Sequence, residues 1–233
     1  MTIDKKNTTI ISLGGSLIVP DDIDTDFLIS FKELICKKIE KGHRFILVSG
    51  GGRTARRYID AVGAIEEIDN EEKDWIGIHS TRLNAQLIRT LFKEHAHPRV
   101  NKNPHDLEDF YVSSSPILVA AGWRPGNSTD LIAVMLAKYL GVKRVANLSN
   151  IDYVYTDDPR ENPEAEKITD ISWSEFREMV GNEWDPGMNA PFDPIASKLA
   201  DEENVEVAII NGKNFESIDS YIEGDDFTGT IIK

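Results

Sequence analysis

The sequence has little cysteine and lacks long apolar runs. Of its 233 residues only Cys36 is a cysteine, which excludes an internal disulfide and any metal site built from several cysteines. No apolar run approaches the roughly 18 residues that a helix needs to cross a bilayer. Residues 1–7 carry no signal-peptide core, so we expect a cytoplasmic protein that does not interact with membranes.

Basic residues are outnumbered by acidic ones. The chain has 26 Lys and Arg against 40 Asp and Glu, and its net charge is −14. This balance repels nucleic acid and anionic membranes, so neither is expected as a partner. It would also slow the approach of an anionic nucleotide, unless the basic residues are gathered at one place. The acidity fits a solvated surface and equally a salt-adapted host.

Some basic residues do gather, directly after a glycine-rich turn. The apolar run 45–48 predicts a buried strand, Gly50–Gly52 follow it, and a helix is expected from Arg53. Glycines leave no Cβ to obstruct a ligand, and a helix start offers free N–H groups. Arg53, Arg56 and Arg57 add positive charge within about two turns. The combination suits a phosphate group, and the plainer interpretation is a tight turn with solvated arginines.

Strands and helices alternate along the chain. The expected strands are residues 9–13, 45–48, 117–120, 144–148, 205–210 and 228–231. The expected helices are 27–39, 53–62, 71–94, 131–140, 172–180 and 215–222, with another beginning at Pro194 and loops at 150–162 and 181–194. This order predicts one α/β domain with a mainly parallel sheet covered on both faces. Ligands of such sheets lie beyond the carboxyl ends of the strands.

Two further features have both a functional and a plainer interpretation. The loop that follows residues 117–120 contains Pro125 and Gly126 and reaches a helix start at Ser128 and Thr129, which predicts phosphate binding. The plainer interpretation is a surface turn with an arginine stacked on the neighbouring tryptophan. Asp74, taken alone, is a helix N-cap or a surface carboxylate. Asp157 and Asp158 and the five histidines show no metal-ligand pattern, so we expect no metal site formed by protein residues.

Several blocks of the sequence occur in the order typical of one family. They are Gly14–Ser16, Gly50–Gly52 with Arg56, Asp74–Ile78, Thr81–Asn84, Pro125–Asp130, Ser149–Asp152, Val154–Thr156, Asp158–Pro159, Asp193–Lys198 and Gly229–Thr230. With them the chain resembles the amino acid kinase superfamily, and within it the uridylate kinases of the archaeal type. The resemblance implies a three-layer α/β/α fold, ATP and UMP as substrates, and a hexamer. It also implies an acceptor-binding part at about 1–145 and an ATP-binding part at about 146–233.

The resemblance assigns roles position by position. The residues matching ATP-binding positions are Gly15, Ser16, Gly52, Arg56, Ser149, Asn150, Tyr155 and Asp158. The residues matching UMP-binding positions are Gly51, Asp74, which would hold the ribose, and the loop Trp123, Arg124, Pro125, Gly126, Asn127, Ser128 and Thr129. Mg²⁺ is expected to be held chiefly by the ATP phosphates and water.

The expected reaction needs charge neutralisation and alignment more than a base. The second pKa of a nucleoside monophosphate is near about 6, so the acceptor is mostly ionised already, and the site must bring two anions into line. Residues 11–17 lack the lysine that many superfamily members carry there. Lys198 is the best substitute, with a solvated helix lysine as the equal alternative, so Arg56 and Lys198 are the expected catalytic cations. Tyr153 also replaces a glycine that is usual in the family.

Other functions stay open. A kinase of the same superfamily could act on a small acceptor, although such an acceptor needs no ribose carboxylate at Asp74. A nucleotide-binding or storage protein without turnover is suggested by the missing lysine and by Tyr153. A dinucleotide-dependent oxidoreductase is remote, because no Gly-x-Gly-x-x-Gly follows a strand.

Overall fold

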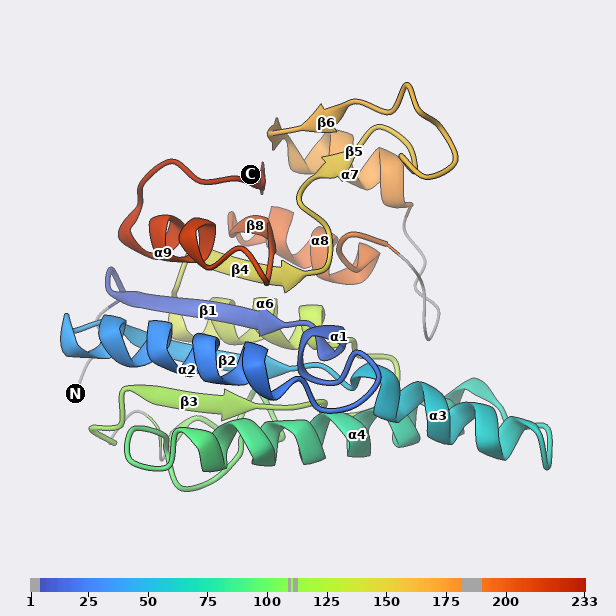
Figure 1. Ribbon diagram of the computed structural model, residues 1–233, viewed down its shortest axis with the longest axis horizontal. Coiled ribbons are helices and arrows are strands. Elements are labelled where there is room, and N and C mark those ends of the chain that lie inside the picture. The colour runs from blue at the N-terminus through green and yellow to red at the C-terminus, as the bar shows by residue number, and fades with distance from the viewer. Residues whose placement is uncertain (1–4, 109, 111–112, 182–189) are drawn as a thin grey trace.

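A seven-stranded sheet forms the centre of the computed structural model, which describes residues 5–108, 110, 113–181 and 190–233 (Figure 1). The strand order is β3-β2-β1-β4-β8-β9-β7. The strands are β1 (Thr8–Leu13), β2 (Arg44–Ser49), β3 (Ile117–Ala120), β4 (Arg144–Ser149), β7 (Asp170–Ile171), β8 (Glu206–Asn211) and β9 (Thr230–Ile232). Neighbouring strands are parallel except for β8 and β9, which run antiparallel.

Helices cover both faces of the sheet. One face carries α2 (Thr25–Glu40), α4 (Asn70–Leu91) and α9 (Phe215–Glu223), and the other carries α6 (Thr129–Leu140), α7 (Trp173–Val180) and α8 (Pro194–Glu202). Successive residues of a strand point to opposite faces, and accordingly Ile10 belongs to the α6 side of the core whereas Ile11 belongs to the α2 side. The predicted three-layer α/β/α fold with a mainly parallel sheet is therefore confirmed.

Side-chain caps explain where the main helices begin. Asp24, Asp69, Ser128, Ser172 and Asp193 each precede a helix and accept a hydrogen bond from a backbone N–H of its first turn. Such caps satisfy donors that the helix itself leaves free. Ser172 and Asp193 thus cap the two helices that the sequence predicted at 172–180 and from Pro194 onward.

Short elements differ from the prediction. Helix α1 (Gly15–Ile18) and the hairpin β5 (Val154–Tyr155) and β6 (Lys167–Ile168) lie in segments expected as loops or left unassigned. Each is too short to show a periodic pattern. In the predicted loop 181–194, residues 182–189 lie outside the described part. None of the described helices is long and apolar enough to cross a membrane.

The pair α3 (Gly52–Gly63) and α4 extends beyond the carboxyl edge of the sheet (Figure 1). Helix α3 packs mainly on α4 and has no buried residue. Tyr58 on α3 and Ile65 just after it are 65% and 86% exposed. This arrangement leaves apolar side chains of the helix pair without a cover in the single chain.

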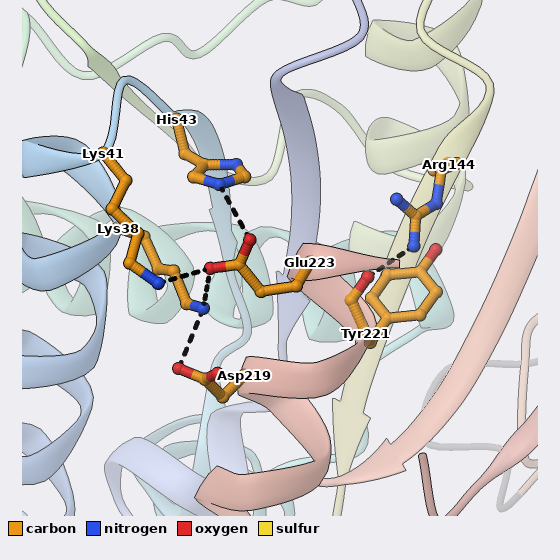
Figure 2. Close-up of polar contacts among 7 residues, drawn as sticks. All are labelled: Lys38, Lys41, His43, Arg144, Asp219, Tyr221 and Glu223. Carbon is orange, nitrogen blue, oxygen red and sulfur yellow. Dashed lines mark hydrogen bonds and ion pairs between the residues drawn. The ribbon is translucent and has the colours of Figure 1, made fainter. Parts of the chain in front are cut away.

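A buried lysine joins α2 to α9 at the other side of the molecule (Figure 2). Lys38 is 1% exposed, and its Nζ lies 2.9 Å from Asp219 Oδ1 and 2.5 Å from Glu223 Oε1. Lys41 Nζ reaches the same Glu223 oxygen at 2.8 Å, and His43 Nε2 lies 3.7 Å from the other one. Hydrogen bonds from Lys38 and Lys41 lower the pKa of Glu223 to about 2. A lysine is seldom buried this deeply unless it is paired, as it is here.

The two lysines allow a matched test of burial. Lys38→Met should lower the free energy of unfolding by about 1–3 kcal/mol, because it removes the charge that both carboxylates share in a desolvated position. Lys41→Met removes a contact to the same oxygen from a side chain that is 61% exposed, and should cost less than about 1 kcal/mol. Urea unfolding of both variants measures the difference, and equal losses would contradict the role of burial.

Candidate active site

The loops at the carboxyl ends of β1, β2, β3 and β4 gather at one edge of the sheet (Figure 1). Strand β1 is flanked by β2 on one side and by β4 on the other. The chain therefore runs outward in two directions from β1, through β2 and β3 and through β4 and β8. Crevices at such switch points are the usual ligand sites of open α/β sheets.

Two glycine turns contact each other at this edge. A Cβ added to Gly15 would lie 2.0 Å from Gly52 N, and one added to Gly52 would lie 2.3 Å from Gly15 O. Gly52 also has φ +65°, a conformation that favours glycine. Asn84 of α4 fixes the turn, since its Nδ2 donates to the carbonyls of Gly50 and Gly51 at 2.8 and 3.1 Å. The contact between the two loops by itself requires glycine at these positions, whether or not a ligand binds there.

The three arginines of α3 are not equivalent. Arg57 Nη2 lies 2.8 Å from Asp21 Oδ1, and Arg53 Nε lies 3.6 Å from the same atom. Arg57 also approaches Asp22 at 3.7 Å. Arg56 is exposed and forms no ion pair with any residue in the described ranges. The predicted group of three cations is therefore largely neutralised, and Arg56 keeps its charge available for an anion.

Asp74 and the 123–129 loop, which the sequence predicted to share one ligand, do lie together. The backbone N–H of Gly126 donates to Asp74 Oδ2 at 2.7 Å. Asp74 lies inside α4, whose N-cap is Asp69, so the plainer interpretation of Asp74 as an N-cap is wrong. Arg124 stacks on Trp123 with its guanidinium carbon 4.0 Å from the ring centre, as the surface-turn interpretation expected.

Two carboxylates, one partly exposed and one buried, meet where α6 and α8 begin. Asp130, in the first turn of α6, accepts from Ser12 Oγ at 2.9 Å and from the backbone N–H of Asp193. Asp193 is 5% exposed, caps α8 through Ala196 N at 2.6 Å and is hydrogen-bonded by the Ser128 hydroxyl. The two helix N-termini therefore converge just beyond the end of β1.

The environment of these carboxylates raises their pKa values. Burial is the main cause for Asp130 and lifts its pKa to about 6, assisted by the charge of Asp193 and opposed by the Ser12 hydrogen bond. Burial likewise raises the pKa of Asp193. Sequence reasoning placed both residues in motifs without giving either one a role at the ligand site. Their position could have indicated a role, because each stands at a helix start after a loop of the kind that binds ligands.

The residues predicted around adenosine lie beyond β4. Ser149 ends that strand and its Oγ accepts from Ile151 N at 3.3 Å, and the exposed Asn150 follows. Tyr155 lies on β5 with its ring edge-on to Tyr153, at 6.4 Å between ring centres. Arg160 binds both carboxylate oxygens of Asp158 and lowers its pKa to about 2. Asp158 therefore already has a cationic partner in this state.

The remaining predicted residues sit on helices facing this edge. Ser16 is in α1, directly after Gly15. Lys198 is in the second turn of α8, exposed, with no ion pair in the described part of the chain. Ser128 caps α6 by accepting from Leu131 N at 3.1 Å. In the ranges that the structure describes, no three His, Cys, Asp or Glu side chains form a group that could hold a metal ion.

Comparisons with known proteins agree with this architecture. The family model described as the amino acid kinase family matches residues 7–211. The uridylate kinase of Pyrococcus abyssi is 33% identical over 222 residues, covering 92% of this chain and 95% of the relative. That of Thermococcus kodakarensis is 34% identical over 232 residues, covering 96% and 98%.

Solved structures show the same fold. The crystal structure of uridylate kinase from Archaeoglobus fulgidus superposes with a TM-score of 0.82 at 28% identity, covering 97% of this chain and 99% of the other. UMP kinase from Bacillus anthracis gives 0.77 at 19% identity, covering 97% and 96%. At that lower identity the likeness concerns the fold alone.

The raised pKa of Asp130 predicts a specific pH dependence. Because the folded state favours the protonated carboxyl, its stabilising contribution is present below pH 4 and is lost as pH rises toward 6. Relative to Asp130→Asn, the free energy of unfolding of the wild type should fall by up to about 2 kcal/mol across this window. Urea unfolding at pH 4.5 and pH 7 measures it, and parallel profiles for both proteins would contradict the assignment.

Proposed function

The chain belongs to the amino acid kinase family, and we propose that it transfers the γ-phosphoryl group of ATP to UMP, giving UDP and ADP. The observation that carries the proposal is the contact between Asp74 and the 123–129 loop beside the crossing glycine turns. This arrangement puts a carboxylate suited to ribose hydroxyls next to a loop and a helix start suited to a phosphate. Alignment with uridylate kinases over most of the chain supports it.

The acceptor site is proposed on the β2 and β3 side of the edge. Asp74 Oδ2 accepts a hydrogen bond from Gly126 N. The second carboxylate oxygen would accept hydrogen bonds from the ribose hydroxyls. The N-terminus of α6, at Ser128 and Thr129, would bind the UMP phosphate. Gly51, without a Cβ, would lie beside the acceptor. A phosphate dianion attacks without a base, so these groups need only hold and orient it.

The donor site is proposed around β1 and β4. Gly15, Ser16 and Gly52 would contact the ATP phosphates, with Ser149, Asn150, Tyr155 and Asp158 near the adenosine. Arg56 and Lys198 are the proposed catalytic cations, because charge spreads over the transferred phosphoryl group in the transition state. Neither is neutralised by a carboxylate in the described part of the structure.

Mg²⁺ is proposed to enter with ATP and to neutralise phosphate charge. The carboxylates at this edge fit that arrangement, because Asp130 and Asp193 are already bonded to hydroxyl and amide donors. The phosphates and water would therefore supply most of the ligands.

We propose a homo-oligomer, which the resemblance implies to be a hexamer, and the α3–α4 pair offers one surface for it. This pair leaves Tyr58 and Ile65 exposed, and exposed apolar surface of this kind marks interaction sites. The division into an acceptor part at about 1–145 and a donor part at about 146–233 stays a proposal, and the two directions in which strands leave β1 support it. A cytoplasmic location, expected from the sequence, stays a prediction.

A panel of acceptors tests the proposed reaction. Purified protein with Mg²⁺-ATP should convert UMP to UDP with kcat/KM at least about tenfold above that for CMP, because the site is matched to one nucleotide. Coupled ADP detection and chromatography of the diphosphates measure it. ADP formed only with a non-nucleotide acceptor would favour a different kinase, and nucleotide binding without turnover would favour a storage role.

Asp74 and Arg56 should separate the two substrates. Asp74→Asn should raise KM for UMP about tenfold with KM for ATP nearly unchanged, because a charged acceptor of hydroxyl hydrogen bonds is lost. Arg56→Ala should lower kcat and raise KM for ATP, and leave KM for UMP close to wild type. Steady-state kinetics with each substrate varied checks both. Unchanged dependence on UMP in Asp74→Asn would exclude the ribose role.

A further inference from the structure

One face of α4 holds the backbone of residues 122–126 through four hydrogen bonds. These residues and the rest of the 123–129 loop form the proposed acceptor loop. Residues 74, 78, 81 and 82 recur at helical spacing and so lie on the same side of α4. Thr81 Oγ1 accepts from Gly122 N at 2.8 Å, and Asp74 Oδ2 accepts from Gly126 N. Arg82 donates from Nε to Gly122 O at 3.2 Å and from Nη2 to Trp123 O at 2.9 Å.

The packing below the loop is tight at Gly122. A Cβ added there would lie 2.9 Å from Thr81 Oγ1 and 3.3 Å from Ile78. At Gly122 the loop therefore packs directly against α4 through its backbone. Its path depends on the α4 side chains that it contacts. Trp123 also contacts the guanidinium of Arg124 and, at 5.0 Å between ring centres, the edge-on ring of His105.

Arg82 differs from the other members of this face because it carries positive charge. It is half-buried, and no carboxylate in the described part of the chain lies within ion-pair distance of it. An unpaired, partly desolvated charge is costly, and here it is met only by two carbonyl dipoles. Those carbonyl oxygens would otherwise present partial negative charge to an incoming phosphate.

We propose that Arg82 is a positioning residue for UMP. Its fork fixes two successive carbonyls of the acceptor loop against α4, and its uncompensated charge lies beneath that loop in a protein of net charge −14. Arg82 thereby determines how strongly the loop binds the acceptor phosphate, without contacting UMP itself. This inference rests on the proposed function, because it presumes that the 123–129 loop receives UMP.

Two substitutions separate the geometry from the charge. Arg82→Met removes both and should raise KM for UMP about tenfold or more, with KM for ATP within twofold of wild type. Arg82→Lys keeps the charge but cannot span both carbonyls. Its KM for UMP should lie between that of the wild type and that of Arg82→Met. Arg89→Met is the control. Arg89 lies two turns further along α4, and its side chain forms no hydrogen bond or ion pair with the described residues, so both KM values should stay unchanged.

The outcomes decide between positioning and plain stability. Calorimetric UMP binding weakened in Arg82→Met and partly restored in Arg82→Lys supports the proposal. KM for UMP within twofold of wild type in Arg82→Met would overturn it, as would equal changes in both KM values together with a lowered Tm. If the wild type binds UMP but forms no UDP, the proposed function fails, and the binding series still decides the role of Arg82.

Discussion

The contact between two bare glycine turns is the constraint on which the rest of the site depends. Gly15 and Gly52 approach so closely that any Cβ between them would clash with backbone. That approach requires β1 and β2 to be adjacent and parallel, and it brings the starts of α1 and α3 together at one edge. The proposed donor and acceptor phosphates would meet beside this crossing, where side chains leave room and helix starts supply N–H groups.

Several basic side chains near this edge have no acidic partner, although the chain as a whole is acidic. The charges of Arg53 and Arg57 are used locally on Asp21, while Arg56, Lys198 and Arg82 have no carboxylate partner among the described residues. Burial raises the pKa values of Asp130 and Asp193, and both carboxylates accept hydrogen bonds from hydroxyl and amide donors. These three unpaired cations belong to a protein whose net charge is −14. The buried charge of Lys38, in contrast, is paired, and its two carboxylate partners link α2 to α9.

The sequence predicted what periodicity and glycine chemistry determine. Helices α2 and α6 and the inner strands came within about two residues of their bounds, because their apolar patterns are long, and the Asp74 pairing with the 123–129 loop followed from family motifs. Helix α1 was too short to predict. The neutralisation of Arg57 by Asp21 and the meeting of Asp130 with Asp193 join segments far apart in the chain. No local pattern encodes such contacts, so only the folded structure reveals them.

The central claim is that one sheet edge holds two anion sites side by side. A crystal structure with UMP and a non-hydrolysable ATP analogue tests it most directly. We expect the analogue's terminal phosphates at the crossing of Gly15 and Gly52 and the UMP phosphate at the start of α6, by Ser128. Phosphates bound away from this edge, or UMP bound far from Asp74, would contradict it.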